Sequence, residues 1–223
     1  MKVREIPHGL IFGANDADYV RSAGLHASDL YGALYKKLQP DRYDKRDKDG
    51  KATPMPMVRI QAGMTLEKII ERVMCETLLG SRPPEMRAGH RPDCPHRKRK
   101  MPPELHCACG AGVYYSPDYL FDEDGALILG EFKCTWMSLK GAPHDKKFLK
   151  YVCQMKIYCY WLGIRKARLF VYFVNGPWSA ATDQYEAFSP VMLAWEFEFT
   201  EQELQREYAL LMRNGIKEGL VKV

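Results

Sequence analysis

Apolar side chains recur every three or four positions in four stretches of the chain. This spacing gathers apolar residues on one side of an α-helix, where they can pack on a core. The first stretch has Leu30, Leu34 and Leu38 on one stripe, Ser28 as the expected N-cap and Pro40 beyond its end. The pattern predicts helices at residues 26–37, about 64–79, about 144–162 and 200–212.

The second and the last of these helices carry further local signals. Five apolar residues form the expected buried stripe of the second helix, namely Leu66, Ile69, Ile70, Val73 and Met74. In the last helix, Thr200 and Glu203 have the spacing of a capping box, and Gly215 follows the expected end. Residues 1–25 and 40–56 are expected to be irregular, because glycine, proline and charged residues interrupt any period.

Residues 115–133 have the pattern of a β-hairpin. Asp124-Gly125 lies between two apolar runs, and this dipeptide favours the tight turn that joins antiparallel strands. With these two residues as the loop, Glu123 lies opposite Ala126. Counting outward along both strands then sets every other pair of the hairpin.

Three charged residues of the hairpin are expected to share one patch. By the same count Asp118 lies opposite Glu131, and side chains alternate along a strand, so Glu131 and Lys133 share a face. Two opposed carboxylates repel each other, which favours a divalent cation between them with the lysine beside it. The alternative is a solvated hairpin face with mixed charges.

Two further strands follow the third helix. Residues 167–174 form an apolar run that is typical of a buried strand, and Asn175-Gly176 closes it. Residues 193–199 alternate aromatic side chains with glutamates. The order of helices, hairpin, helix, two strands and helix predicts one mixed α/β domain, residues 1–223, with a central sheet flanked by helices.

The composition fits such a domain. Of the 223 residues, 46% are hydrophobic and 27% are charged, and 33 Lys and Arg against 28 Asp and Glu give a net charge of +5. This mild excess is compatible with a polyanionic partner. The chain shows neither an apolar run long enough to cross a bilayer nor an apolar signal-peptide core, so a cytoplasmic protein is expected.

A long basic connection at about 80–111 contains three of the seven cysteines and three of the six histidines of the chain. Cys94-x-His96 and Cys107-x-Cys109 offer four soft ligands to a zinc ion. Their spacing differs from the usual pair of cysteines two residues apart, and free thiols in a basic loop are the alternative. The odd number of seven cysteines argues against a disulfide framework.

Pro117-Asp118, followed by Glu131-Phe132-Lys133, resembles the motif of the PD-(D/E)XK nuclease superfamily. Members of this superfamily have a restriction-endonuclease-like core, in which a central mixed sheet is flanked by helices. The short Glu-x-Lys pattern is weak when it stands alone.

Two neighbouring helices add to the resemblance. Gln154 and Tyr158 lie one turn apart on one face of the third helix and resemble the additional motif of the RecB-type branch. Gly63-x-x-x-Glu67 resembles the acidic helix of phage-type and YqaJ-like exonucleases. The resemblance covers about residues 63–176.

The resemblance implies a DNA nuclease that uses Mg²⁺ or Mn²⁺, which prefer oxygen ligands. Lys133 would orient or deprotonate the attacking water, and Gln154 and Tyr158 would position a phosphate. The implied metal ligands are the carboxylates of Glu67, Asp118 and Glu131 and the backbone carbonyl of Phe132. Relatives with an iron–sulfur cluster have three cysteines near the C-terminus; the last cysteine here is Cys159, so no such cluster is expected.

DNA is the partner that the resemblance implies, together with a single-strand annealing or other recombination protein and further copies of the chain. The charge pattern predicts six DNA-binding residues, namely Arg97, Lys98, Arg99, Lys100, Lys147 and Lys150. An exonuclease of phage-type recombination or repair is favoured over an endonuclease. The alternatives are a structure-specific endonuclease, a nuclease acting on RNA, and a non-catalytic nucleic-acid-binding module with a zinc-binding basic loop.

Overall fold

The computed structural model confirms the predicted fold class, a mixed α/β domain with a five-stranded mixed sheet flanked by helices. It describes residues 1–6, 24–40, 65–66, 68–70, 72–73, 83–91, 94–98, 106–136, 142–174 and 191–221. Glu67, Arg99 and Lys100, the segment 41–64 and the dipeptide at 175–176 lie outside the described residues.

The sheet has the strand order β1-β7-β6-β5-β4. Its strands are β1 (Lys2–Ile6), β4 (Tyr119–Glu123), β5 (Ala126–Thr135), β6 (Lys166–Phe173) and β7 (Val191–Glu198). All pairs are antiparallel except β5 and β6, which are parallel. A parallel pair needs a long connection, and the helix α4 supplies it. A second small sheet pairs β2 (Met86–Arg87) with β3 (Tyr114–Tyr115).

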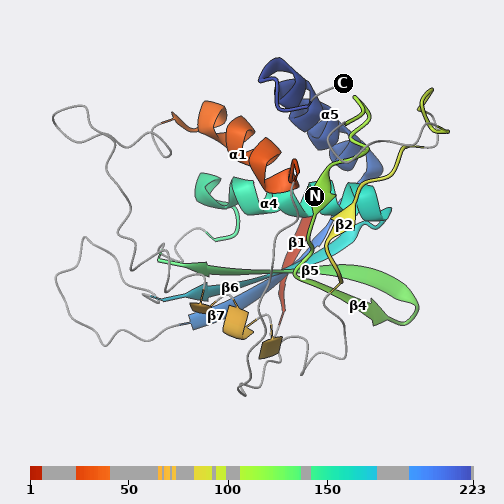
Figure 1. Cartoon of the computed structure of the whole chain (residues 1–223). Helices are drawn as coiled ribbons and strands as arrows, with labels where there is room; N and C mark the ends of the chain where they lie inside the picture. The colour runs from red at the N-terminus through yellow and green to blue at the C-terminus, as the bar shows by residue number, and fades with distance from the viewer. Residues whose placement is uncertain are drawn as a thin grey trace, which may run out of the picture.

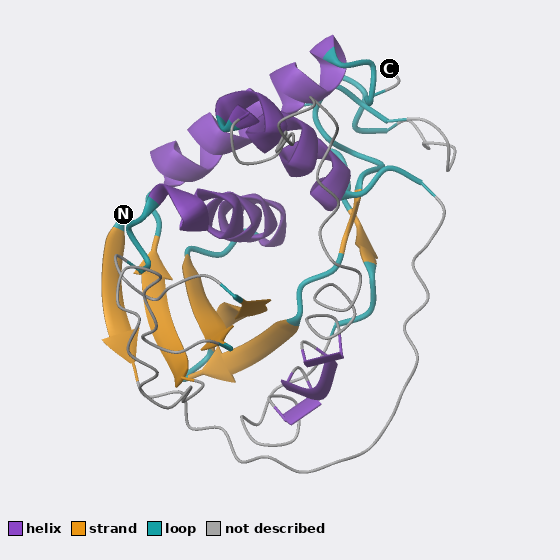
Figure 2. Ribbon diagram, turned by 90° about the vertical axis from the view of Figure 1, so that its left-hand side faces the viewer, coloured by secondary structure: helices purple, strands orange, loops and turns teal. Residues whose placement is uncertain are grey.

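Three helices lie on one side of the large sheet, with α4 next to the sheet and α1 and α5 packed on α4 (Figures 1 and 2). They are α1 (Ala27–Leu38), α4 (Leu149–Leu162, preceded by the short 3₁₀ helix η1, Lys146–Phe148) and α5 (Glu201–Lys217). The main core lies between these helices and the sheet. Ile70 and Val73, from the helical residues described between 65 and 73, pack on the opposite face against Phe132 and Phe170. Helices therefore cover both faces.

The predicted hairpin is confirmed at its turn. Asp124 and Gly125 have φ values of 56° and 80°, as a two-residue turn with two left-handed residues requires. Glu123 pairs with Ala126, which is the predicted register. The Asp122 carboxylate accepts a hydrogen bond from the Gly125 N–H at 2.7 Å and closes the turn. The register that sets the site is thus fixed locally.

A row of charged side chains crosses the sheet and joins four of its five strands. Arg4 and Arg168 both pair in register with Glu196 on β7, and both guanidinium groups donate to its carboxylate. Arg168 also binds Glu123 at 2.7 Å. The row joins β1, β7, β6 and β4, which are far apart in the sequence.

The structure corrects the prediction for the N-terminal segment. Residues 1–25 were expected to be irregular, but β1 pairs with β7 at the edge of the sheet. Helix α1 is capped by His26 rather than by Ser28, because the Asp29 carboxylate accepts the backbone N–H of His26 at 3.0 Å. Leu38, predicted on the buried stripe, is exposed.

Two further helix predictions change in detail. Thr200 and Glu203 form the predicted capping box, but α5 continues to Lys217. Gly215 therefore lies within the helix, where an added Cβ would meet Leu30 Cδ2 at 2.6 Å. In the second helix Ile70 and Val73 are buried as predicted, but Ile69 is exposed.

Candidate active site and candidate metal centre

Asp118, Glu131 and Lys133 meet on one patch, as the hairpin register predicts. The Lys133 ammonium donates to Asp118 Oδ2 at 3.3 Å and to Glu131 Oε2 at 3.1 Å. The backbone N–H of Phe132 donates to the same Asp118 oxygen at 2.9 Å. Asp118 lies just before β4, and the other three residues lie on β5. The strand pairing thus holds both carboxylates against one ammonium.

Glu131 is the most deeply buried member of the patch. Its side chain is 1% exposed, and its Oε1 has no hydrogen-bond partner among the described residues. Burial and the nearby Asp118 carboxylate raise the pKa of Glu131 well above its ordinary value, although Lys133 opposes this. A buried carboxylate oxygen that has no partner among the described residues, beside a second carboxylate, fits a bound divalent cation, for which Asp118 and Glu131 would be ligands.

Helix α4 adds two buried polar side chains next to this patch. Gln154 and Tyr158 share a face as predicted, and Gln154 Nε2 donates to Tyr158 Oη at 3.4 Å. Burial, and then the charges of Tyr31, Glu131 and Asp118, raise the pKa of Tyr158. The phenol therefore stays protonated at neutral pH. Because its oxygen accepts from Gln154, its own proton is free to serve as a donor.

Tyr31 of α1 belongs to the same neighbourhood, and sequence reasoning missed it. Burial raises its pKa most, and the charges of Lys133, Glu131 and Asp118 act on it as well. In the sequence Tyr31 is one more apolar position of an amphipathic helix. No local signal distinguishes it, because its neighbours at the site come from β5 and α4.

The predicted DNA-binding cations divide between two places. The Lys150 ammonium lies over the Tyr31 ring, 5.6 Å from its centroid, and so borders the acidic patch. Lys147 lies over Phe148 and 4.0 Å from Asp145 at the start of α4. Arg97 and Lys98 are exposed on the turn that follows Cys94, about 50 residues before α4. DNA binding by these residues remains a prediction.

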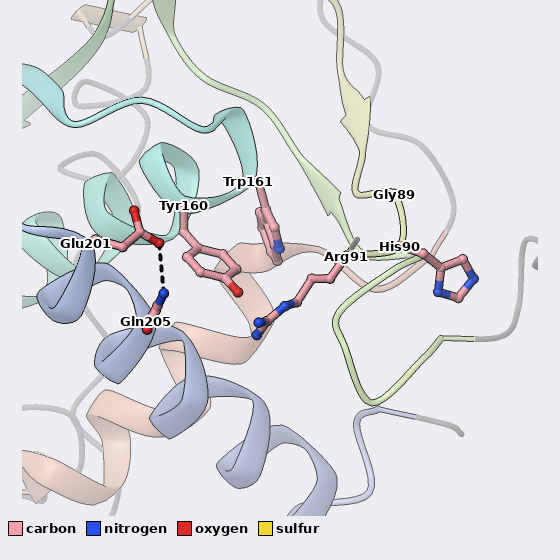
Figure 3. Close-up of a pocket in the computed structure, with 7 residues that line it drawn as sticks. All are labelled: Gly89, His90, Arg91, Tyr160, Trp161, Glu201 and Gln205. Atoms are coloured by element: carbon pink, nitrogen blue, oxygen red, sulfur yellow. Dashed lines mark hydrogen bonds between the residues drawn. The ribbon is translucent and has the colours of Figure 1, made fainter. Parts of the chain in front are cut away.

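A cavity of about 210 Å³ adjoins the candidate active site. Tyr158 lines it together with Ser116, which precedes Asp118 by two residues, and with the first turn of α1. A larger hollow of about 440 Å³ lies between the segment 89–91 and the helices α4 and α5 (Figure 3). Neither Asp118 nor Glu131 lines the larger hollow.

The basic connection contains a second cluster that can hold a metal ion. One donor atom each from His90, Cys94, Cys107 and Cys109 lies within 4.8 Å of the others. The sequence predicted His96 in place of His90. His96 is exposed at the edge of this cluster, with its Nδ1 3.7 Å from Cys107 Sγ. Both histidines are close to Cys94 in the sequence, and spacing alone cannot choose between them.

The thiols of the cluster differ in their acidity. Burial raises the pKa of Cys107 to about 11. At Cys109 burial acts in the same direction, but hydrogen bonds from the backbone of Arg91 and Ala111 and from His90 prevail and lower the pKa to about 7. Backbone donors that stabilise a thiolate also favour its binding to a metal ion.

Comparison with known proteins identifies no family. No family model matches the chain, and no curated protein matches it in sequence. Among solved structures, SSO0001 is similar with a TM-score of 0.47 and 12% identity, over 91% of this chain and 79% of that chain. LHK-Exo in complex with dAMP is similar with a TM-score of 0.44 and 16% identity, over 87% of this chain and 89% of that chain. In the described part of the chain, no helix is long and apolar enough to span a membrane.

Proposed function

We propose that the protein is a metal-dependent nuclease that hydrolyses phosphodiester bonds of DNA. One observation carries the proposal: the Lys133 ammonium contacts two carboxylates, one of which is buried and has an oxygen with no hydrogen-bond partner among the described residues. If both carboxylates are ionised, the three groups sum to one negative charge. Without a cation, burial and the Asp118 carboxylate favour the protonated form of Glu131, whereas a bound cation would balance two ionised carboxylates.

The carboxylates of Asp118 and Glu131 would hold Mg²⁺ or Mn²⁺. The Phe132 carbonyl and Glu67, which lies outside the described residues, complete the proposed ligand set. Such a cation neutralises charge on the scissile phosphate and makes a bound water a better nucleophile.

The remaining residues act directly on water and phosphate. The Lys133 ammonium orients the attacking water and stabilises the negative charge that develops on the phosphate. To act as the base, Lys133 first releases one proton to solvent, and its neutral amine then accepts the proton of the water at Nζ. The Tyr158 hydroxyl donates a hydrogen bond to a phosphate oxygen, since its own oxygen already accepts a hydrogen bond from Gln154. Lys150, on the same helix, attracts the phosphate backbone electrostatically.

Cleavage of labelled DNA with Mg²⁺ or Mn²⁺ tests the proposal. We expect the wild type to digest duplex or single-stranded DNA, and the variants Asp118→Asn and Lys133→Ala to be slower by about 10²-fold or more. Lys166→Ala is the matched control, because Lys166 is an exposed lysine of β6 whose side chain lies on the other face of the sheet from Leu169, the residue that pairs with Glu131. Negligible cleavage by wild type and both site variants alike, under all conditions, would refute the proposal.

The same experiment separates the alternatives. Digestion of linear DNA with sparing of covalently closed circles supports the exonuclease that we favour, whereas nicked circles support an endonuclease. Preferential cleavage of RNA or of branched DNA would change the substrate but keep the site. DNA binding that Asp118→Asn leaves unchanged, together with no cleavage by the wild type, would instead support a non-catalytic binding module.

A further inference from the structure

Four donor atoms in the basic connection have the spacing of ligands around one metal ion. His90 Nδ1 lies 3.5 Å from Cys94 Sγ and 3.4 Å from Cys109 Sγ, and Cys94 Sγ lies 3.7 Å from Cys107 Sγ. A tetrahedral zinc ion with Zn–S near 2.3 Å and Zn–N near 2.0 Å separates its ligand atoms by about 3.5–3.8 Å. A disulfide would need sulfur atoms about 2.05 Å apart. These three distances match a shared ion, and all four donor atoms lie within 4.8 Å of one another.

We propose that His90, Cys94, Cys107 and Cys109 bind a single zinc ion in a closed structural site. Three thiolates and one imidazole are soft and borderline donors that select zinc over Mg²⁺ and Mn²⁺. All four tetrahedral positions come from the protein, so none is left for a substrate. The proposal concerns a site separate from Asp118 and Glu131, and it holds whether or not the chain cleaves DNA.

Two tight turns bring the ligands together. In the first, the Cys94 carbonyl accepts the Arg97 N–H at 3.0 Å, and the His96 N–H points to Cys94 Sγ at 3.4 Å. In the second, the Cys107 carbonyl accepts the Gly110 N–H at 2.8 Å, and the Cys107 N–H binds the Ala111 carbonyl at 2.9 Å. Backbone donors next to the sulfurs offset the negative charge of metal-bound thiolates.

The second turn packs directly against α5. Gly110 has a φ of +81°, and an added Cβ would lie 2.5 Å from the Tyr208 hydroxyl oxygen. Both the backbone conformation and the lack of space therefore favour glycine at this position. Cys109, one residue earlier, acts electrostatically on Tyr208. A zinc ion held here would tie the first turn, which carries Arg97 and Lys98, to the helical layer.

The first ligand also borders the larger hollow. Figure 3 shows that the His90 ring points away from Tyr160, whereas the next side chain, Arg91, points toward it. The Arg91 guanidinium lies over the Tyr160 ring, 5.7 Å from its centroid. Binding of His90 to zinc would fix the backbone from which Arg91 extends, and with it one wall of the hollow.

Metal content of the full-length chain tests the ligand set. We expect about one zinc per chain in the wild type by elemental analysis, and loss of most of it in Cys109→Ser and His90→Ala. His96→Ala is the matched control, because its ring is next to Cys107 but outside the proposed set. Cys134→Ser controls for the loss of a thiol elsewhere, since Cys134 packs against the core on the opposite face of the sheet, with Phe132 and Phe170. Both controls should keep their zinc.

Cobalt substitution covers the case in which the ligand variants fail to fold. Wild-type protein refolded with Co²⁺ should show the strong visible bands of tetrahedral cobalt and a thiolate-to-cobalt charge-transfer band, and zinc should abolish both. Zinc removal by a chelator should lower the melting temperature of wild type and of His96→Ala alike. A wild type that contains no zinc and binds Co²⁺ without these bands overturns the proposal. Zinc loss in His96→Ala with retention in His90→Ala overturns the ligand set, as does iron in place of zinc.

Discussion

Lys133 Nζ donates to Glu131 Oε2 at 3.1 Å, from a position two residues further along the same strand. The same ammonium also serves Asp118, so one positive charge is shared between two carboxylates. Glu131 is almost completely buried, and a buried carboxylate that is only half neutralised lowers stability. The burial of Glu131 thus lowers the free energy of unfolding, as the proposed role in binding a cation would require.

We expect the metal-free wild type to lose stability relative to Glu131→Gln as the pH rises. The folded state raises the pKa of Glu131 above the ordinary value of 4.5, so the protonated carboxyl contributes stability that is complete below that value. The contribution disappears as the pH rises through the raised pKa. Melting temperatures in a chelator, from mildly acidic to mildly alkaline pH, would show the two curves diverging.

Manganese provides the control for this effect. Mn²⁺ should raise the wild-type melting temperature most at alkaline pH, where Glu131 is ionised, and should have a smaller effect on Glu131→Gln. Parallel curves for the two proteins, with and without Mn²⁺, would show that Glu131 does not titrate in this range and does not bind the ion.

Tyr158→Phe should slow DNA cleavage by about five- to tenfold, since it removes one hydrogen bond of ordinary strength from the site. Single-turnover rates with saturating enzyme measure this effect on the chemical step. Tyr160→Phe is the matched control: Tyr160 lies on the same helix but stacks on Tyr208, with ring centroids 4.3 Å apart. Equal rates for both variants would mean that the Tyr158 hydroxyl does not contact the substrate.

Glu196→Gln should lower the free energy of unfolding by about 1–3 kcal/mol near neutral pH, because two arginines donate to this carboxylate. Burial opposes the ionised form, but Arg168 and Arg4 outweigh it and lower the pKa of Glu196. A lowered pKa contributes stability above the ordinary value of 4.5, and this is lost as the pH falls through the folded value. Urea unfolding at several pH values should therefore show the deficit shrinking in acid.

Glu198→Gln is the comparison on the same strand. Its partner Lys2 is 86% exposed in its side chain, and such surface pairs contribute about 0–1 kcal/mol. If Glu198→Gln cost as much as Glu196→Gln, the burial of the charge row would not explain its effect.

Gly215→Ala should destabilise the protein by about 1–3 kcal/mol, because the new methyl would overlap Leu30 and Val221, which lie 2.6 Å and 2.9 Å from it. Gly32→Ala in α1 is the opposite case. Among the described residues nothing lies within 4 Å of an added Cβ at Gly32, so alanine should stabilise that helix by about 0.5–1 kcal/mol. Thermal unfolding of the two variants should shift in opposite directions, and shifts of the same sign would contradict the packing argument.

Local sequence determined the parts of the fold that depend on nearest neighbours. The Asp124-Gly125 turn sets the hairpin register, and that register places Asp118 beside Lys133. The Thr200 and Glu203 capping box was equally readable, since both partners lie within one helical turn. These features could be predicted because their energies come from residues close in the chain.

Features that depend on distant partners could not be read in this way. β1 pairs with β7, about 190 residues later, and its own five residues carry no signal that predicts this pairing. Gly215 appeared to end a helix, but contact with Leu30 of α1 explains it. His90 and His96 are equally plausible ligands by spacing, and only the path of two turns separates them. In each case the deciding contact joins segments far apart in sequence.

The parallel pairing of β5 and β6 through α4 has a consequence for how the protein can change over evolution. Asp118, Lys133 and Tyr158 all come from one uninterrupted stretch that ends with β6. The far edge of the sheet, β7 and β1, supplies none of the proposed active-site residues. Substitutions at that edge should therefore mainly alter thermal stability and leave the stretch with Asp118, Lys133 and Tyr158 unchanged, whereas the proposed ligand Glu67 lies outside that stretch.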